Sequence, residues 1–152
     1  MNIVICGSMT NYSKMVTIKE RLISMGNKVI LPDPSTNEQL KKIISKGYVD
    51  TYKLKIKYDY IRKHYNHIVE ADCIIIANYD KNKIKNYIGG NAFLEIGFAH
   101  ILKKPIYLVN PVPKIRYYFH EIKAMNPIIL NNQLSIFKSF KDKNSVAVRQ
   151  QI

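Results

Sequence analysis

Residues 73–77 read Cys-Ile-Ile-Ile-Ala, an apolar run without a polar position, and a long polar loop follows it. A strand that is apolar at every position, not only at every second one, is buried on both faces. Strands of this kind occur at the centre of parallel sheets that are covered by helices on both sides. Residues 73–77 therefore predict a central strand of an α/β protein.

On both sides of this run, short apolar segments alternate with segments of helical spacing. The expected strands are residues 2–6, 28–31, 73–77, 105–109 and 127–130. The expected helices are residues 13–25, 51–71, 91–102 and 117–125, with a short one within 35–49. This alternation predicts a doubly wound sheet of parallel strands with right-handed crossovers and helices on both faces.

Length and composition indicate one compact globular domain. A chain of 152 residues with 47% apolar and 23% charged residues is typical of a soluble globule and not of a disordered or fibrous chain. We expect residues 1–140 to form the domain and residues 141–152 to form a polar C-terminal tail.

The sequence also favours a cytoplasmic protein without a membrane span. No run approaches the roughly 20 apolar residues that a span needs, and the stretch Ile3-Val4-Ile5 is too short for a signal peptide. Cys6 and Cys73 lie in predicted buried strands, where we expect reduced thiols.

The charge balance favours an anionic partner. The chain has 24 basic and 11 acidic residues, a formal net charge of +13, which attracts nucleotides, nucleic acid or membrane surfaces. The lysines are spread along the chain and are not interleaved with aromatic residues in a nucleic-acid motif. AT-rich coding would produce the same lysine excess. We therefore expect a phosphate-bearing small ligand and not nucleic acid or a membrane.

Ligands of parallel α/β sheets bind outside the carboxyl ends of the strands. The first such loop contains Cys6, Gly7, Ser8 and Met9 and leads into a helix. Gly7 allows a close backbone approach, and the Ser8 hydroxyl lies near a helix start, which favours anions. The loop is neither a Walker A motif nor G-x-G-x-x-G. A glycine turn with a capping serine explains most sequences of this kind.

A second candidate segment, residues 89–100, reads Gly-Gly-Asn-Ala-Phe-Leu-Glu-Ile-Gly-Phe-Ala-His. Gly89 and Gly90 before a helix would expose its first backbone amides to a ligand. Glu95 lies about one turn inside that helix, and a buried carboxylate there is costly without partners. Alternatively, Glu95 stabilises the helix dipole from the first turns. The spacing alone leaves both interpretations open.

Four segments together resemble the nucleoside 2-deoxyribosyltransferase family and the related deoxynucleoside 5′-monophosphate N-glycosidases. They are C-G-S (6–8), E-A-D (70–72), G-G-N-A-F-L-E-I-G-F-A-H (89–100) and K-K-P-I-Y-L-V-N (103–110). The resemblance covers about residues 2–130 and implies a flavodoxin-like sheet, for which we expect the strand order 2-1-3-4-5. It also implies that Glu95 is a nucleophile that forms a covalent glycosyl-enzyme, from which a second base or water takes the sugar.

The same resemblance implies further site residues, and we expect no metal or other cofactor. A site for the 5′-phosphate or 5′-hydroxyl of a nucleotide or nucleoside would include Cys6, Gly7, Ser8, Met9, Asn78, Gly89, Gly90 and Asn91. Asp80 lies in the loop where deoxyribosyltransferases carry an acid near the base. The family's usual aspartate, two turns ahead of the A-D pair, is replaced by His64. Histidine is an acid or base near neutral pH, yet the replacement equally fits altered or lost activity, with Asp59 and Asp72 as fallback acids.

Three functions follow from these patterns. The first is an enzyme that cleaves or transfers the N-glycosidic bond of a (2-deoxy)nucleoside or its 5′-monophosphate. The second is a nucleotide-binding module without turnover, and the third is a nucleic-acid-associated basic protein. The resemblance also implies at least a homodimer. We expect its contacts at the helix that ends near residue 71 and at the aromatic segment 117–119.

Overall fold

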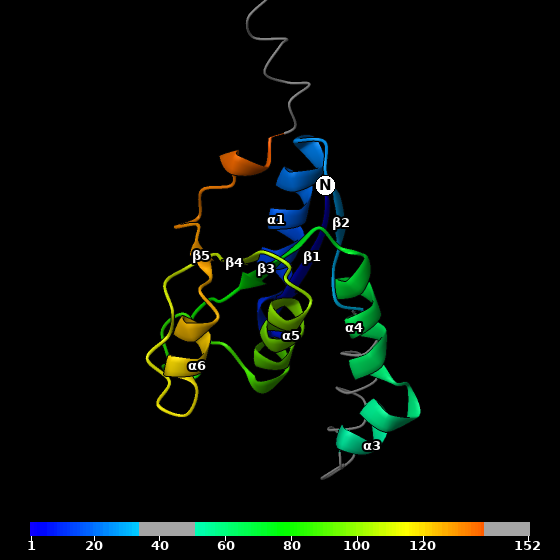
Figure 1. Cartoon of the computed structure of the whole chain (residues 1–152), viewed down its shortest axis with the longest axis vertical. Coiled ribbons are helices and arrows are strands. Elements are labelled where there is room, and N and C mark those ends of the chain that lie inside the picture. The colour runs from blue at the N-terminus through cyan, green and yellow to red at the C-terminus, as the bar shows by residue number, and fades with distance from the viewer. Residues whose placement is uncertain (34–50, 139–152) are drawn as a thin grey trace, which may run out of the picture.

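The computed structural model describes residues 1–33 and 51–138. In these ranges five parallel strands form one sheet in the order β2-β1-β3-β4-β5 (Figure 1). The strands are β1 (Asn2–Gly7), β2 (Lys28–Ile30), β3 (Cys73–Ala77), β4 (Ile106–Leu108) and β5 (Ile128–Ile129). The predicted parallel α/β fold and its strand order are confirmed, and β3 is buried at every position.

Helices connect the strands. Their bounds are α1 (Tyr12–Ser24), α3 (Thr51–Lys57), α4 (Tyr60–Glu70), α5 (Gly90–Ile101) and α6 (Phe119–Ala124), with 3-10 helices η1 (Met9–Asn11) and η2 (Ser135–Phe137). Most of these bounds lie close to the predicted ones. The exception is the predicted helix 51–71.

That helix is two helices, because the chain turns at Asp59. Asp59 adopts a left-handed backbone conformation with φ 49°, which aspartate tolerates better than most residues. Its N–H bonds to the carbonyl of Ile56 at 3.2 Å, and its carboxylate pairs with Arg62 at 2.8 Å. Neither glycine nor proline marks the break, and the apolar spacing continues across it, so the pattern predicted one helix.

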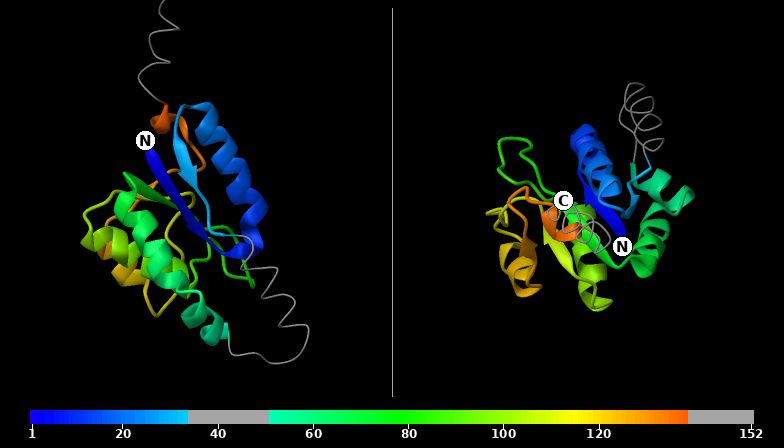
Figure 2. Two further views of the ribbon diagram at one scale, coloured as in Figure 1. Left: turned by 90° about the vertical axis from the view of Figure 1, so that its right-hand side faces the viewer. Right: turned by 90° about the horizontal axis from the view of Figure 1, so that it is seen from above.

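The two faces of the sheet carry separate cores. Alternate residues of β1 and β3, among them Val4, Cys6 and Ile74, pack against α4, α5 and α6. The intervening residues, such as Ile5 and Ile75, pack against α1 and the segment around η2. The view from above in Figure 2 separates α1 from α5 and α6 in this way. Cys6 therefore faces the layer that contains α4 and α5.

Two further expectations concern the described residues. Both cysteines are free and buried. Within residues 1–33 and 51–138, no helix combines the length and hydropathy needed to cross a membrane. The predicted short helix within 35–49 and the predicted tail 141–152 lie outside the described residues.

Candidate active site

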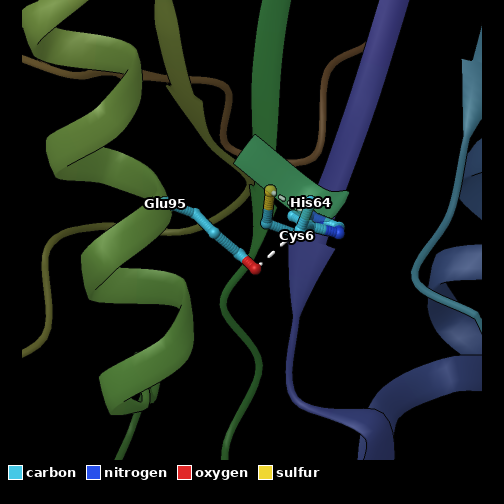
Figure 3. A group of neighbouring side chains, drawn as sticks. All are labelled: Cys6, His64 and Glu95. Carbon is cyan, nitrogen blue, oxygen red and sulfur yellow. Dashed lines mark hydrogen bonds and ion pairs between the residues drawn. The ribbon is translucent and has the colours of Figure 1, made fainter. Parts of the chain in front are cut away.

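Three side chains from three elements meet beside the carboxyl ends of β1 and β3. Cys6 comes from β1, His64 from α4 and Glu95 from α5, and their polar atoms converge on one point (Figure 3). His64 Nε2 lies 3.3 Å from Glu95 Oε1 and 3.6 Å from Cys6 Sγ. The structure thus places Glu95 and His64, both predicted as catalytic, in direct contact.

Helix periodicity explains why Glu95 points inward. Ala92, Ile96 and Ala99 are the buried residues of α5, and Glu95 belongs to the same i, i+3, i+4 stripe. Its side chain is only 15% exposed. Glu95 is therefore a core-facing residue and not a solvated residue of the first helical turn.

Helix α4 places His64 in the same way. Ile68, one turn later, is fully buried against the sheet, and residues four apart share a helix face. The His64 side chain is 16% exposed. Packing of α4 beside α5 then brings the imidazole to the carboxylate.

Burial controls the protonation of all three groups. It raises the pKa of Glu95 to about 7, against the opposing effects of a hydrogen bond from Cys6 and the positive charge of Lys55. Burial lowers the pKa of His64 to about 4, and nearby His67 adds to this shift. Burial, followed by the charge of Glu95, holds the pKa of Cys6 well above its ordinary value. At neutral pH the imidazole is thus neutral, and its contact with Glu95 is a hydrogen bond and not an ion pair.

A pocket opens on Glu95 and His64. Its volume is about 570 Å³, within the range of small-molecule sites. Residues from α4, α5 and the ends of β1 and β2 line it, including Met9, Leu31, Tyr60, Ile61, Leu94 and Phe98. The exposed area of the wall is mainly apolar, and the Glu95 carboxylate and the His64 imidazole are joined there by Lys55, Lys63, Asn66, His67, Glu70 and Asn91.

A second pocket adjoins the first at the start of α5. It has a volume of about 730 Å³. The two pockets share Gly7, Met9, Lys55 and Asn91. The second is also lined by Ser8, Thr10, Lys81, Tyr87, Gly89, Gly90 and Ala92. Together they gather most of the substrate-binding residues predicted from the two loops.

Sequence reasoning missed two lysines of the second pocket. Lys81 Nζ donates a hydrogen bond to Ser8 Oγ at 2.8 Å, and Lys55 Nζ donates to Asn91 Oδ1 at 2.9 Å. Lysines are spread along the chain, and no local sequence pattern distinguishes these two from the others. The position of Lys81, soon after a strand end, was the one available signal.

Asn78 and Asp80 line neither pocket. Asn78 is fully buried, and its side-chain amide donates to the carbonyls of Asn110 and Pro111 while its Oδ1 accepts the Asn110 N–H. These bonds tie the end of β3 to the end of β4. Asp80 is exposed, and its Oδ1 accepts the N–H of Asn86 at 2.9 Å. Asn78 is thus bonded to the loop after β4 and Asp80 to its own loop, and neither side chain faces the pockets.

The fallback acids are also engaged elsewhere. Asp59 forms the break between α3 and α4, as described above. Asp72 Oδ2 accepts the N–H of Asn2 at 2.6 Å, at the end of the sheet where β1 begins. Of the candidate acids, Glu95 is the one that the structure combines with a pocket.

Comparison with known proteins supports the fold. No protein-family model and no curated protein matches the chain. Among solved structures, a 2-deoxyribosyltransferase from Bacillus psychrosaccharolyticus is similar with a TM-score of 0.50 and 19% identity over 71% of each chain. The CMP N-glycosidase BcmB of Clostridium botulinum has a TM-score of 0.48 and 15% identity, covering 90% of this chain and 96% of its own.

The first of these similarities agrees with the motif resemblance described for residues 2–130. The chain has the flavodoxin-like fold of the 2-deoxyribosyltransferase structure.

Proposed function

We propose that this protein cleaves or transfers the N-glycosidic bond of a 2-deoxynucleoside or its 5′-monophosphate, with Glu95 as the nucleophile. One observation carries the proposal: a core-facing carboxylate, 15% exposed, opens on a pocket of about 570 Å³ at the carboxyl edge of the sheet. The shared fold and the motif around Glu95 support it.

The reaction has two displacements. A Glu95 carboxylate oxygen bonds to the anomeric carbon while the bond to the base breaks and its electron pair stays on the base nitrogen. Water or a second base then attacks the same carbon and releases Glu95. Because burial raises the pKa of Glu95 to about 7, the carboxylate that attacks is poorly solvated and reactive while still populated near neutral pH.

His64 acts by positioning Glu95. Its pKa of about 4 leaves little imidazolium at neutral pH, so proton donation to the departing base is disfavoured. A neutral imidazole with its proton on Nε2 instead donates a hydrogen bond to Glu95 Oε1, which lies 3.3 Å away. This bond would fix the carboxylate rotamer that faces the pocket.

The second pocket would bind a 5′-phosphate. It lies at the N-terminus of α5, where unpaired backbone amides and the helix dipole favour anions. The ammonium groups of Lys55 and Lys81 and the Ser8 hydroxyl line the same space. The apolar pocket would then hold the base and sugar beside Glu95.

A chromatographic screen tests the proposal. Purified protein is incubated with nucleosides and 5′-monophosphates, with and without a free acceptor base. We expect free base to appear from at least one deoxynucleotide, and a new nucleoside to form if transfer competes with hydrolysis. Tight binding of these compounds without base release would contradict the enzymatic function.

One observation favours a second function, binding of nucleotides without turnover. His64 occupies the place where the resemblance implies an aspartate, and its neutral imidazole is a poor acid. Calorimetric titration with the same panel separates the two functions, because a binding module gives saturable heat and no product.

A further inference from the structure

We propose that Cys6, His64 and Glu95 form a Zn²⁺ site. A thiolate sulfur, an imidazole nitrogen and a carboxylate oxygen are the three donor types that proteins offer zinc. This site goes beyond the proposed glycosidase or transferase function, which needs no metal.

The distances between the donor atoms fit a tetrahedral zinc ion. With Zn–S about 2.3 Å, Zn–N about 2.05 Å and Zn–O about 2.1 Å, tetrahedral angles separate S from N by about 3.6 Å and N from O by about 3.4 Å. The structure has 3.6 Å between Cys6 Sγ and His64 Nε2 and 3.3 Å between His64 Nε2 and Glu95 Oε1. All three ligand atoms lie within 4.8 Å of one another. Small side-chain rotations would bring Cys6 Sγ and the Glu95 carboxylate oxygen to the separation that a tetrahedral ion requires.

The donors are held by three packed elements. Cys6 lies near the carboxyl end of β1, and His64 and Glu95 belong to α4 and α5. Figure 3 shows the three side chains converging. Cys6 is fully buried, and the other two side chains are 16% and 15% exposed. A site built on helices and strands needs little reorganisation to take up a metal.

Three protein ligands leave a fourth position for water. The apolar pocket reaches His64 and Glu95, so solvent and the ion itself have access from that side. Three ligands with an open position are typical of zinc sites that exchange their fourth ligand.

The donor set selects the metal. Thiolate and imidazole ligands favour Zn²⁺ and its transition-metal neighbours over Mg²⁺ and Ca²⁺, which prefer oxygen. On binding, the Cys6 thiol releases its proton to solvent, and the thiolate and carboxylate together offset the double positive charge of the ion.

Occupancy of this site has a consequence that rests on the proposed function. Zn²⁺ on Glu95 would take the lone pair that attacks the anomeric carbon. The metal would therefore inhibit base release, and a chelator would restore it.

Cobalt titration of the full-length protein tests the site directly. Co²⁺ replaces Zn²⁺ in such sites and shows thiolate-to-metal charge transfer in the near ultraviolet and intense visible bands when tetrahedral. We expect a saturable signal at one equivalent, displaced by Zn²⁺, in protein kept reduced by a phosphine. Cys6→Ser should lose the charge-transfer band, and His64→Gln and Glu95→Gln should weaken binding at least about tenfold.

Cys73→Ala is the matched control, because it removes the other buried cysteine and leaves the three ligands in place. Circular dichroism verifies that each variant is folded, and Cys6→Ala replaces Cys6→Ser if the latter unfolds. The proposal is overturned by the absence of a saturable Co²⁺ signal in the wild-type protein, or by an unchanged band in folded Cys6→Ser. Cobalt binding without any base release from metal-free protein would leave the zinc site standing and contradict the enzymatic function alone.

Discussion

Glu95 is a carboxylate in a helix whose other inward residues are apolar. The core contacts of Ala92, Ile96 and Ala99 fix the face that α5 turns to the sheet, so Glu95 faces inward with them. A buried carboxylate destabilises the fold unless it has partners, and its hydrogen-bonding partners are His64 and Cys6. The proposed nucleophile is thus a group whose burial these two partners offset in part.

Replacing Glu95 by glutamine removes the charge and keeps the shape. We expect Glu95→Gln to lower base release by about 10³-fold or more, because a nucleophile acts on the barrier, while calorimetry shows nearly unchanged nucleotide binding. A covalent sugar adduct on wild-type Glu95, detected by mass spectrometry with a slow 2-fluoro substrate, should be absent from the variant.

Glu121→Gln is the control, since Glu121 is exposed on α6 and lines neither pocket. Full activity of Glu95→Gln would exclude Glu95 as the nucleophile.

Burial of Cys73 makes the free energy of unfolding depend on pH in the alkaline range. Burial raises the pKa of its thiol from 9.0 to about 12, and the charge of Asp72 acts in the same direction. Between these values the unfolded chain loses the proton and the folded protein keeps it. The stabilisation is complete below pH 9, and wild-type protein should lose about 1.4 kcal/mol per pH unit above it.

Urea denaturation from about pH 8 to about pH 10.5 measures this loss. Cys73→Ala should lack this part of the slope, although other groups also titrate in both proteins. Equal slopes for the two proteins would show that burial of Cys73 does not control alkaline stability.

At the scale of elements, Gly7 sets how closely β1 approaches its neighbours. A Cβ atom at Gly7 would lie 3.1 Å from Met15 Sδ and 3.2 Å from the carbonyl oxygen of Ala77. The Ala77 carbonyl oxygen belongs to the backbone of β3 and cannot move aside as the end of a flexible side chain can. The glycine thus allows β1, β3 and α1 to pack tightly at the edge where the site lies.

Gly7→Ala should therefore lower the free energy of unfolding by about 1–3 kcal/mol. Gly97→Ala is the matched comparison, because Gly97 lies inside α5 and its added Cβ meets no atom within 4 Å. There the same change should raise stability by about 0.5–1 kcal/mol through lower backbone entropy of the unfolded chain. Chemical denaturation measures the free energy of unfolding of both variants. An unchanged or higher value for Gly7→Ala would contradict the packing argument.

At the scale of the whole molecule, the structure places two of the 24 basic residues at one pocket. Lys55 and Lys81 come from α3 and from the loop after β3, yet both line the pocket at the start of α5. A phosphate there would meet two ammonium groups and the helix dipole together.

We therefore expect a 5′-monophosphate to bind at least about tenfold more tightly than its nucleoside at low salt, since one hydrogen bond to a charged group contributes about 1.5–3 kcal/mol. Lys81→Gln and Lys55→Gln should each reduce this preference, and exposed Lys114→Gln should not. Calorimetry with matched pairs measures it. Equal binding of the nucleoside and its monophosphate would show that the basic surface does not serve this pocket.

Two strongly exposed apolar residues lie on the segments where we expect the homodimer contacts. Ile56 on α3 is 73% exposed and Tyr117 is 88% exposed, and both belong to the segments named for self-association. We expect sedimentation at tens of micromolar to show at least a dimer, which Ile56→Glu weakens and Ile136→Glu on η2 leaves intact. A monomeric wild-type protein would contradict this assembly.

The sequence by itself determined the architecture, because apolar periodicity is a local property that the fold must satisfy. The unbroken apolar run of β3 predicted a central strand, and the alternation of elements predicted the parallel sheet, while its strand order came with the family resemblance. The glycine loops followed from the rule that parallel sheets bind ligands at their carboxyl edge, whereas the expected role of Glu95 came from the resemblance in residues 89–100.

Tertiary structure alone decided how these residues combine. The break at Asp59 leaves the apolar spacing unchanged, so no periodic pattern reports it. The meeting of Cys6, His64 and Glu95 depends on the packing of α4 and α5 over β1, and the loop bonds of Asn78 depend on the register of β3 and β4. Distances between elements arise from crossovers and core packing, and these join residues far apart along the chain.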